Sequence, residues 1–283
     1  METGNKVDCY GCRACEQICP AQCINMREDS EGFLYPEVDP NLCTHCGLCK
    51  RVCPNESIER LLPTENQFDQ KAYAAIHKNE EVVYSSSSGG MFSAIIDVIF
   101  ERGNSVIFGV ELDNNFQAVH SYAENVEDTQ KFRKSKYIQS NIGNSYEVTA
   151  EFLKTGRRVL FTGTPCQVAG LRTYLGKSYD NLLCVDIICK GVPSQKIFDV
   201  YRDYIEKKFG GIMKSFSFRH KTFRDSEWYS RNVSMEINSE KIVSNNHDDP
   251  YLKGFHSRLF FRPSCYECSF SCPTRELFCH VEF

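Results

Sequence analysis

The chain opens with two cysteine runs of identical spacing, Cys9-x2-Cys12-x2-Cys15-x3-Cys19-Pro20 and Cys43-x2-Cys46-x2-Cys49-x3-Cys53-Pro54. Three thiolates spaced in this way can surround one corner of an iron–sulfur cube, and the fourth cysteine usually serves the other cluster. The proline after each run turns the chain away, because its φ is fixed and it has no N–H. A pair of zinc sites is the alternative, but zinc ligands typically come in two separated pairs. The spacing therefore predicts two 4Fe-4S clusters.

The spacing also assigns the ligands of the two clusters. We expect one cluster on Cys9, Cys12, Cys15 and Cys53, and the other on Cys43, Cys46, Cys49 and Cys19. This stretch resembles bacterial two-cluster ferredoxins, so residues 1–62 are predicted to form a small ferredoxin domain. Cys23 falls outside the pattern and is predicted to be a small buried residue.

Length, charge and cysteine usage exclude several classes of protein. A chain of 283 residues is long enough for a ferredoxin module and one larger domain. The net charge of −4 gives no indication of binding to nucleic acid or to an anionic membrane surface. No apolar stretch of about 18 residues is present, which argues against a transmembrane segment. Sixteen cysteines without a signal sequence indicate thiolate ligands rather than disulfides, and we expect a reducing, cytoplasmic location.

Strands and helices are predicted to alternate beyond a polar linker at residues 62–70. Apolar and β-branched runs predict strands at 72–77, 105–111, 116–123, 158–162, 182–188, 213–219 and 232–237. Apolar residues at helical spacing predict helices at 91–102, 147–154 and 195–209.

Two polar segments are candidates for binding phosphate or flavin. Ser85-Ser86-Ser87-Ser88-Gly89-Gly90 precedes a predicted helix, whose free N–H groups and positive dipole end suit a phosphate. An ordinary helix cap with a flexible lead-in is the alternative. In Ser135-Lys136-Tyr137-Ile138-Gln139-Ser140, a lysine flanked by hydroxyls is able to hold a flavin or phosphate, although a solvated lysine is the simpler interpretation.

Further cysteines follow predicted strands in the second half of the chain. Thr162-Gly163-Thr164-Pro165-Cys166-Gln167 is a strand-to-helix turn, and the helix dipole there stabilises a thiolate, as nucleophile or as metal ligand. Because ligand-binding residues cluster at the carboxyl ends of strands, Cys166 and Cys189 are expected to meet. Two buried thiols are the alternative, and for Cys184, inside a strand, burial is the preferred interpretation. Cys265-x2-Cys268 is able to supply half of a zinc knuckle or half of a third iron–sulfur site.

From Ser85 onward the sequence resembles the family of beta subunits of coenzyme F420-reducing hydrogenases and dehydrogenases. The segments that carry the resemblance occur in the family's order: Ser87-Ser88-Gly89-Gly90, Ser135-Lys136-Tyr137, Thr162-Gly163-Thr164-Pro165-Cys166-Gln167, Val185-Asp186-Ile187-Ile188-Cys189, Gly191-Val192-Pro193-Ser194 and Arg262-Pro263-Ser264-Cys265-Tyr266-Glu267-Cys268. Members with an N-terminal two-cluster ferredoxin are common in this family. The resemblance implies an FAD-containing oxidoreductase domain at residues 71–283, with an iron–sulfur cluster of its own.

The resemblance also implies which residues hold these cofactors. By motif match, the candidates for FAD and its phosphates are Ser87, Ser88, Gly89, Gly90, Ser135, Lys136, Tyr137, Thr162, Gly163 and Thr164. The candidate ligands of a third 4Fe-4S cluster are Cys166, Cys189, Cys265 and Cys268. No catalytic residue is assigned. The expected fold class is α+β, with a small two-cluster ferredoxin domain followed by a larger mixed α/β flavin-binding domain.

This chain departs from the family pattern at two places. Lys190 stands where the family has histidine after the second motif cysteine. Family members also usually continue past the last cysteine pair, so we expect the domain at 71–283 to be C-terminally incomplete.

The expected function is that of an iron–sulfur flavoprotein oxidoreductase. It would pass electrons between a small-molecule hydride carrier, F420 or another, and a redox partner protein or subunit, through FAD and the clusters. The alternative is a non-catalytic, ferredoxin-type electron-transfer or docking protein with a degenerate flavin domain.

Overall fold

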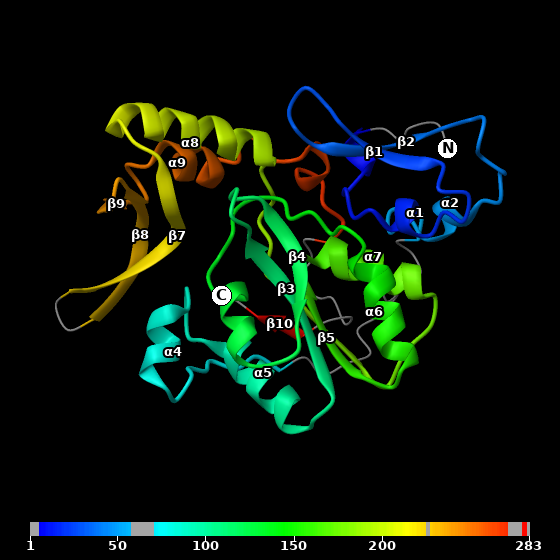
Figure 1. Cartoon of the computed structure of the whole chain (residues 1–283), viewed down its shortest axis with the longest axis horizontal. Coiled ribbons are helices and arrows are strands. Elements are labelled where there is room, and N and C mark those ends of the chain that lie inside the picture. The colour runs from blue at the N-terminus through cyan, green and yellow to red at the C-terminus, as the bar shows by residue number, and fades with distance from the viewer. Residues whose placement is uncertain (1–5, 58–70, 225–226, 271–278, 282–283) are drawn as a thin grey trace.

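The structure, a computed structural model, describes residues 6–57, 71–224, 227–270 and 279–281. Its N-terminal module is built on an antiparallel hairpin of β1 (Ile24–Glu28) and β2 (Leu34–Val38). A short 3₁₀ turn, η1 (Lys6–Asp8), precedes two one-turn helices, α1 (Ala14–Gln17) and α2 (Leu48–Arg51). Each of these helices carries one cysteine of a run, Cys15 in α1 and Cys49 in α2, and Figure 1 shows both helices beside the hairpin.

A five-stranded sheet forms the centre of the larger part, in the order β10-β6-β5-β3-β4. Its strands are β3 (Ser105–Leu112), β4 (Ala118–Ala123), β5 (Arg158–Gly163), β6 (Leu182–Ile187) and β10 (Cys279–Val281). The pairs β3–β5, β5–β6 and β6–β10 are parallel, and only the edge strand β4 runs antiparallel. The continuous burial of β3 and β5 is typical of parallel strands that are covered on both faces.

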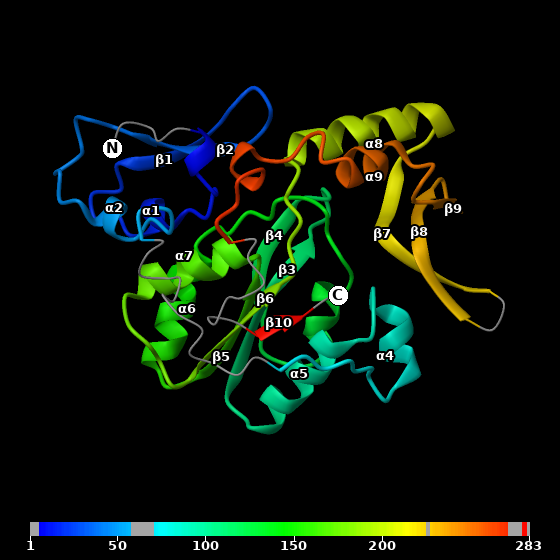
Figure 2. The same cartoon turned by 180° about the vertical axis from the view of Figure 1, so that it is seen from behind.

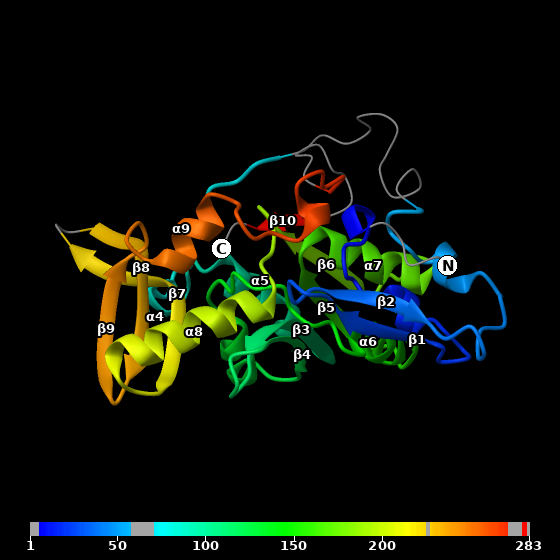
Figure 3. The same ribbon diagram turned by 90° about the horizontal axis from the view of Figure 1, so that it is seen from above.

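Helices cover both faces of this sheet. Alternate side chains of β3 point to opposite faces. Phe108 packs with α6 (Ser145–Lys154) and α7 (Pro165–Leu175), whereas Ile107 packs with α5 (Met91–Glu101). The short elements α4 (Glu80–Ser85) and η2 (Glu127–Phe132) complete the α5 side. Figure 3 shows the N-terminal hairpin beside α6 and α7, so the module lies against the opposite side from α5.

A separate three-stranded antiparallel sheet lies beyond the central sheet. It consists of β7 (Met213–Arg224), β8 (Glu227–Ile237) and β9 (Glu240–Asn245), packed against α8 (Gln195–Phe209) and α9 (Pro250–His256). After α9, the orange-red segment in Figure 2 runs past β2 toward α7 and contains the turn η3 (Pro263–Cys265). The chain thus returns from the far sheet to the N-terminal module.

The fold class is the expected α+β arrangement, with a small module followed by a larger mixed α/β part. The predicted strands at 105–111, 158–162 and 182–188 are confirmed, and the predicted helix at 195–209 coincides with α8. The strand predicted at 72–77 is wrong. Its apolar residues Tyr73 and Ile76 are exposed, because no described strand pairs with this segment and no described core residue covers them. The predicted linker at 62–70 lies outside the described residues.

No helix in the described part of the chain is long and apolar enough to cross a membrane.

Candidate cofactor sites

Four cysteines of the module gather where α1 approaches the body of the protein. Burial, together with the neighbouring Cys9 and Cys53 thiols, raises the pKa of the Cys15 thiol to about 12. Burial also raises the pKa of Cys12, and the nearby thiols of Cys15, Cys53 and Cys9 add to this increase. The structure therefore brings together the four cysteines expected to hold one cluster, here called the first set.

The remaining cysteines of the module line a separate cavity of about 300 Å³. Its wall contains all four residues expected to hold the second cluster, here called the second set: Cys19, Cys43, Cys46 and Cys49. Cys46 is exposed to solvent. The second set is therefore open to solvent at Cys46.

Cys23 is buried, as predicted, but it also belongs to the wall of this second cavity. Its Sγ lies 3.4 Å from the Sγ of Cys19, and its thiol is hydrogen-bonded to Cys19 and Cys43. The hydrogen bond to Cys19, together with burial, raises the pKa of Cys23 to about 12. In the sequence, only its position four residues after Cys19 indicated that Cys23 lies near the second set.

A third group of cysteines meets at the carboxyl ends of β5 and β6. Cys166 stands in the first turn of α7 and Cys189 just after β6, while η3 and the residues that follow it bring Cys265 and Cys268. Burial raises the pKa of Cys166, and the three other thiols add to the shift, Cys189 most strongly. These four cysteines, here called the inner set, come from three segments far apart in the sequence.

Local sequence fixes the start of α7 and thereby Cys166. Thr164 is the N-cap and Pro165 occupies the first helical position, where its missing N–H costs no hydrogen bond. The Oε1 of Gln167 accepts hydrogen bonds from both the N–H and the Oγ1 of Thr164, each at 3.0 Å. The Sγ of Cys166 lies 3.2 Å from Oγ1 of Thr164.

A cavity of about 290 Å³ adjoins the inner set. Six of the ten residues expected to hold FAD line it: Ser135, Lys136, Tyr137, Thr162, Gly163 and Thr164. Cys189 of the inner set lines it as well, and Phe92, Val110 and Ile138 give it an apolar wall. The cavity and the inner set therefore share a boundary, and we call it the central cavity.

The charged residues that line the central cavity are all basic. They are Lys134, Lys136, Lys190 and Arg219, and no Asp or Glu is among the described lining residues. Such a lining favours an anionic ligand. The position at which the family has histidine is therefore occupied by one of these cations, Lys190, whose Nζ donates to the carbonyl of His256 at 2.9 Å.

Lys136 contributes its charge without offering a free donor. Its Nζ donates to the carbonyls of Lys131, Phe132 and Arg133 at 3.2, 2.9 and 2.7 Å. An ammonium group has three N–H donors, so these bonds occupy all of them. Burial lowers the pKa of Lys136 to about 7. Its role in the central cavity is that of a fixed, buried base rather than a direct hydrogen-bond donor to a ligand.

The Ser/Gly loop at 87–90 is not among the residues that line the central cavity. The buried Oγ of Ser87 instead accepts a hydrogen bond from the N–H of Ser135 at 2.9 Å. The carbonyl of Ser88 accepts from Nζ of Lys221 at 2.6 Å, and Gly90 caps α5. The loop therefore contacts the Ser135 segment, which lines the central cavity, without lining the cavity itself.

His120, in β4, was not singled out from the sequence. It is buried behind Thr162, with its ring stacked on Phe161 at 5.6 Å between centroids and 12° between planes. One ring nitrogen contacts Oγ of Ser140 at 3.1 Å and the other the carbonyl of Thr162 at 3.2 Å. Burial lowers the pKa of His120 to about 4, so the ring is neutral near pH 7. In the sequence, only the presence of a histidine within a largely apolar strand indicated that this residue is unusual.

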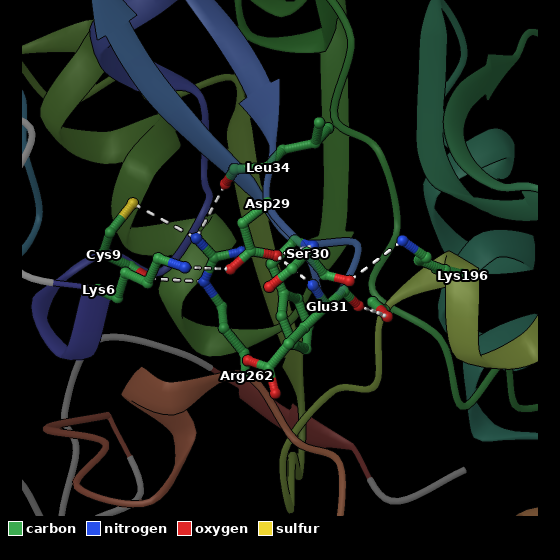
Figure 4. A network of polar contacts seen from close by, with 10 residues as sticks. Lys6, Cys9, Asp29, Ser30, Glu31, Leu34, Lys196 and Arg262 are labelled. Atoms are coloured by element: carbon green, nitrogen blue, oxygen red, sulfur yellow. Dashed lines mark hydrogen bonds and ion pairs between the residues drawn. The ribbon is translucent and has the colours of Figure 1, made fainter.

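The module and the larger part share side-chain contacts around the first and inner sets. Tyr10 packs with Ala169 and Phe270, and Cys166 and Cys268 border this cluster. At Gly170 in α7, an added Cβ would lie 3.1 Å from Sγ of Cys12. Figure 4 shows a further polar network here, in which Lys196 donates to the carbonyl of Ser30 at 3.1 Å.

The chemistry of the three donor sets fits iron–sulfur clusters. Each set supplies four thiols, the number that a 4Fe-4S cluster takes. Nowhere among the described residues do three His, Cys, Asp or Glu side chains converge closely enough for a single metal ion. A four-iron cluster binds each of its four cysteines at a different iron, so their sulfur atoms lie farther apart than the ligands of a single metal ion.

Comparisons with known protein families agree with this geometry. Residues 8–57 match the 4Fe-4S dicluster domain, and residues 156–274 match the C terminus of the coenzyme F420 hydrogenase/dehydrogenase beta subunit. The region 156–274 is therefore similar to the C-terminal part of this beta subunit, and the N-terminal region to a dicluster ferredoxin domain. Both matches indicate a relation to iron–sulfur electron-transfer subunits of the F420 hydrogenase/dehydrogenase type.

Two curated proteins are similar to this chain. It is 24% identical over 177 residues to one of the subunits of the F(420)H(2) dehydrogenase of Methanosarcina mazei, covering 58% of this chain and 47% of that protein. It is 27% identical over 173 residues to the coenzyme F420-dependent sulfite reductase of Methanocaldococcus jannaschii, covering 58% and 24% respectively. The chain therefore spans less than half the length of either relative.

A chain of the F420-reducing [NiFe] hydrogenase complex from Methanosarcina barkeri is similar in structure. The TM-score is 0.44 at 18% sequence identity, over 69% of this chain and 66% of that one.

Proposed function

We propose that this chain is an iron–sulfur flavoprotein oxidoreductase that exchanges electrons between a soluble hydride carrier of the F420 type and a partner protein. The observation that carries the proposal is the continuity of three sites. The central cavity shares Cys189 with the inner set, and the inner set borders Tyr10 of the module.

The central cavity fits part of an anionic, partly aromatic ligand such as FAD. Its volume lies near the lower end of the range for ligand pockets, about 300–1,000 Å³. The four basic residues would attract the phosphates, and the hydroxyls of Ser135, Thr162 and Thr164 would orient polar ring edges. When bound, FAD would supply the conversion between two-electron and one-electron transfer.

The chain's own residues give the proposed cofactors a linear order. Thr164 and Cys189 place the inner set beside the central cavity. Gly170 lets Cys12 of the first set approach α7 closely, because a Cβ there would lie only 3.0 Å from Cβ of Cys12. The second set lies on the far side of the module, where Cys46 reaches solvent. The order is therefore central cavity, inner set, first set, second set.

The exposed end of this order is the proposed docking point for a protein partner. Electron transfer between proteins requires short distances, and the second set is the part of the order that is open to solvent at Cys46. The names of the two relatives refer to F420, which supports an F420-type carrier at the opposite end.

Anaerobic purification with iron counting and acid release of flavin tests the proposal. We expect about twelve irons and one FAD for each chain, as for three four-iron clusters. About eight irons without flavin would instead identify a non-catalytic ferredoxin-type protein. Cys166→Ser should lose about four irons, whereas Cys184→Ser should keep all of them, because the buried Cys184 stands inside β6 and belongs to none of the sets.

The carrier is tested separately by mixing the holoprotein with reduced F420 or with NADH and NADPH. Bleaching of the flavin absorbance by reduced F420 alone is the expected result. If neither class of donor bleaches the flavin, the proposed carrier is wrong even where the cofactors are present.

A further inference from the structure

Arg262 is the largest of the fully buried side chains, with 1% of its surface exposed. It stands at the start of η3, three residues before Cys265, and the N–H of Cys265 donates to its carbonyl at 2.8 Å. Its side chain leaves the larger part and enters the module between β2 and the first cysteine run (Figure 4). It therefore links the inner set to the first set.

The guanidinium group binds the module through several donors. Its Nε donates to the carbonyl of Cys9 at 2.6 Å, and Nη2 donates to the carbonyl of Leu34 at 2.9 Å. Nη2 also reaches Sγ of Cys9 at 3.5 Å, within the range of an N–H···S hydrogen bond. Nη1 donates to Oε1 of Gln139 at 3.0 Å. One buried cation thus contacts both the backbone and the sulfur of a predicted cluster ligand.

The neighbouring residues shield this cation from water. The guanidinium carbon lies 4.3 Å from the ring centroid of Tyr35 and 5.4 Å from that of Phe33. A Cβ at Gly11, between Cys9 and Cys12, would lie 2.7 Å from Nη1, and the φ of Gly11 is +69°. Glycine at this position is therefore needed for the guanidinium to approach the cysteine run so closely.

The charge of Arg262 has no protein counter-ion in the described part of the chain. Its hydrogen-bond partners there are two carbonyls, an amide oxygen and a thiol, and none of the ion pairs between described residues includes it. A buried charge without a partner is costly, and aromatic faces compensate for only part of that cost. A four-iron cluster with four thiolate ligands carries net negative charge, which would compensate for the positive charge of Arg262.

We propose that Arg262 is the counter-charge of the cluster ligated through Cys9 and that it raises the reduction potential of this cluster. This inference rests on the proposed ligation of a cluster by the first set. Reduction adds one electron, and therefore one negative charge, to the cluster. A fixed cation and an N–H···S bond stabilise the reduced form more than the oxidised form. Arg262 is thus a positioning residue that tunes one step of the electron path.

The reduction potentials of the assembled protein test this role, measured by anaerobic titration with dithionite and monitored by electron paramagnetic resonance. The signal of the first cluster is assigned beforehand with Cys9→Ser, whose altered ligand changes that cluster alone. If Cys9→Ser changes no signal, the ligation itself is wrong, and this outcome is distinguishable from a failure of Arg262.

Arg262→Met removes the charge and should lower the reduction equilibrium constant of the first cluster about tenfold, which corresponds to about 59 mV for one electron. Arg262→Lys keeps the charge and should retain most of the wild-type potential. The second cluster serves as the internal reference. Arg27→Met is the matched control, because Arg27 lies in the same module but is exposed and paired with Glu37. It should leave the first potential unchanged.

Further outcomes show whether Arg262 acts through its charge or only through its shape. Equal potentials in the wild type and in Arg262→Met would overturn the proposal, and so would equal shifts in the Met and Lys variants, because geometry rather than charge would then be responsible. If Arg262→Met loses the iron of the first cluster while Arg262→Lys keeps it at the wild-type potential, the counter-charge is supported. Loss of that iron in both variants would assign Arg262 a purely structural role.

Discussion

His120 and Lys136 are buried bases whose charged forms are both disfavoured by burial, with different consequences at pH 7. The pKa of the His120 ring is well below its usual value, so the ring remains neutral. It stacks on Phe161 and is hydrogen-bonded to the carbonyl of Thr162. Lys136 has a pKa of about 7 and keeps three carbonyl acceptors for its ammonium form. A polyanion in the central cavity would favour that charged form.

The neutral state of His120 predicts a loss of stability in mild acid. Its folded-state pKa of about 4 lies below the usual 6.5, so the unfolded chain binds the proton first as the pH falls. Its contribution is fully present above about pH 6.5 and decreases toward pH 4, by about 1 kcal/mol between pH 7 and 5.5. Thermal unfolding of the holoprotein at both pH values measures this loss. The loss should be smaller in His120→Gln, and equal losses in the two proteins would contradict the assignment.

Helix α7 is the element on which the proposed sites converge. Its first turn presents Cys166 to the inner set, and its middle turns face the module. Cys12 lies against Gly170, and Oγ1 of Thr173 donates to the carbonyl of Val52 at 2.6 Å. One helix therefore sets the separation between the inner and first sets.

Gly170→Ala should test the close packing of α7. The added Cβ would lie 2.7 Å from the Tyr146 hydroxyl and 3.0 Å from Cβ of Cys12, so either the module or α6 must shift. Overpacking of this kind typically costs about 1–3 kcal/mol. We expect a lower thermal midpoint and slower electron transfer from flavin to the first cluster in rapid mixing. Lys154→Ala, at an exposed site of α6, should change neither quantity.

At the scale of the whole molecule, the module and the larger part share one hydrophobic core. Ala14 and Val52 of the module pack in the same cluster as Val106, Phe161 and other residues of the central sheet and its helices. Among the described residues, no hydrophobic cluster belongs to the module alone.

This shared core predicts one cooperative unfolding transition. Loss of far-ultraviolet circular dichroism and bleaching of the iron–sulfur absorbance should coincide when the holoprotein is heated anaerobically. Bleaching complete at a temperature where the secondary structure is still intact would show that the module opens independently and would contradict the prediction.

The sequence is informative where the ligand geometry is local. Each cysteine run encodes its own turns within eleven residues, so the gathering of the first and second sets could be predicted. For the inner set, the strand-end rule predicted that Cys166 and Cys189 meet. Adding Cys265 and Cys268 required the family resemblance, because the returning segment brings them from far along the chain. Ligation of a cluster by the inner set stays a prediction.

Other features could not be predicted because they depend on distant contacts. The segment at 72–77 has strand composition but pairs with no strand in the part of the chain that the structure describes. Arg262 was visible only as part of a motif, since its partners Cys9 and Leu34 are 253 and 228 residues away. The Ser/Gly loop has the composition of a phosphate site, yet Ser87 is buried against Ser135.

The distance in sequence between Cys9 and Arg262 has a consequence for how the protein is made. During synthesis the module leaves the ribosome first, and the arginine that binds its cysteine run is added 253 residues later. At about 5–20 residues per second this interval is on the order of 10–50 seconds. Throughout that time the thiols of the nascent module are without Arg262 and the turn η3, although α7 is completed earlier. A cluster inserted into the growing chain would therefore precede the docking of Arg262.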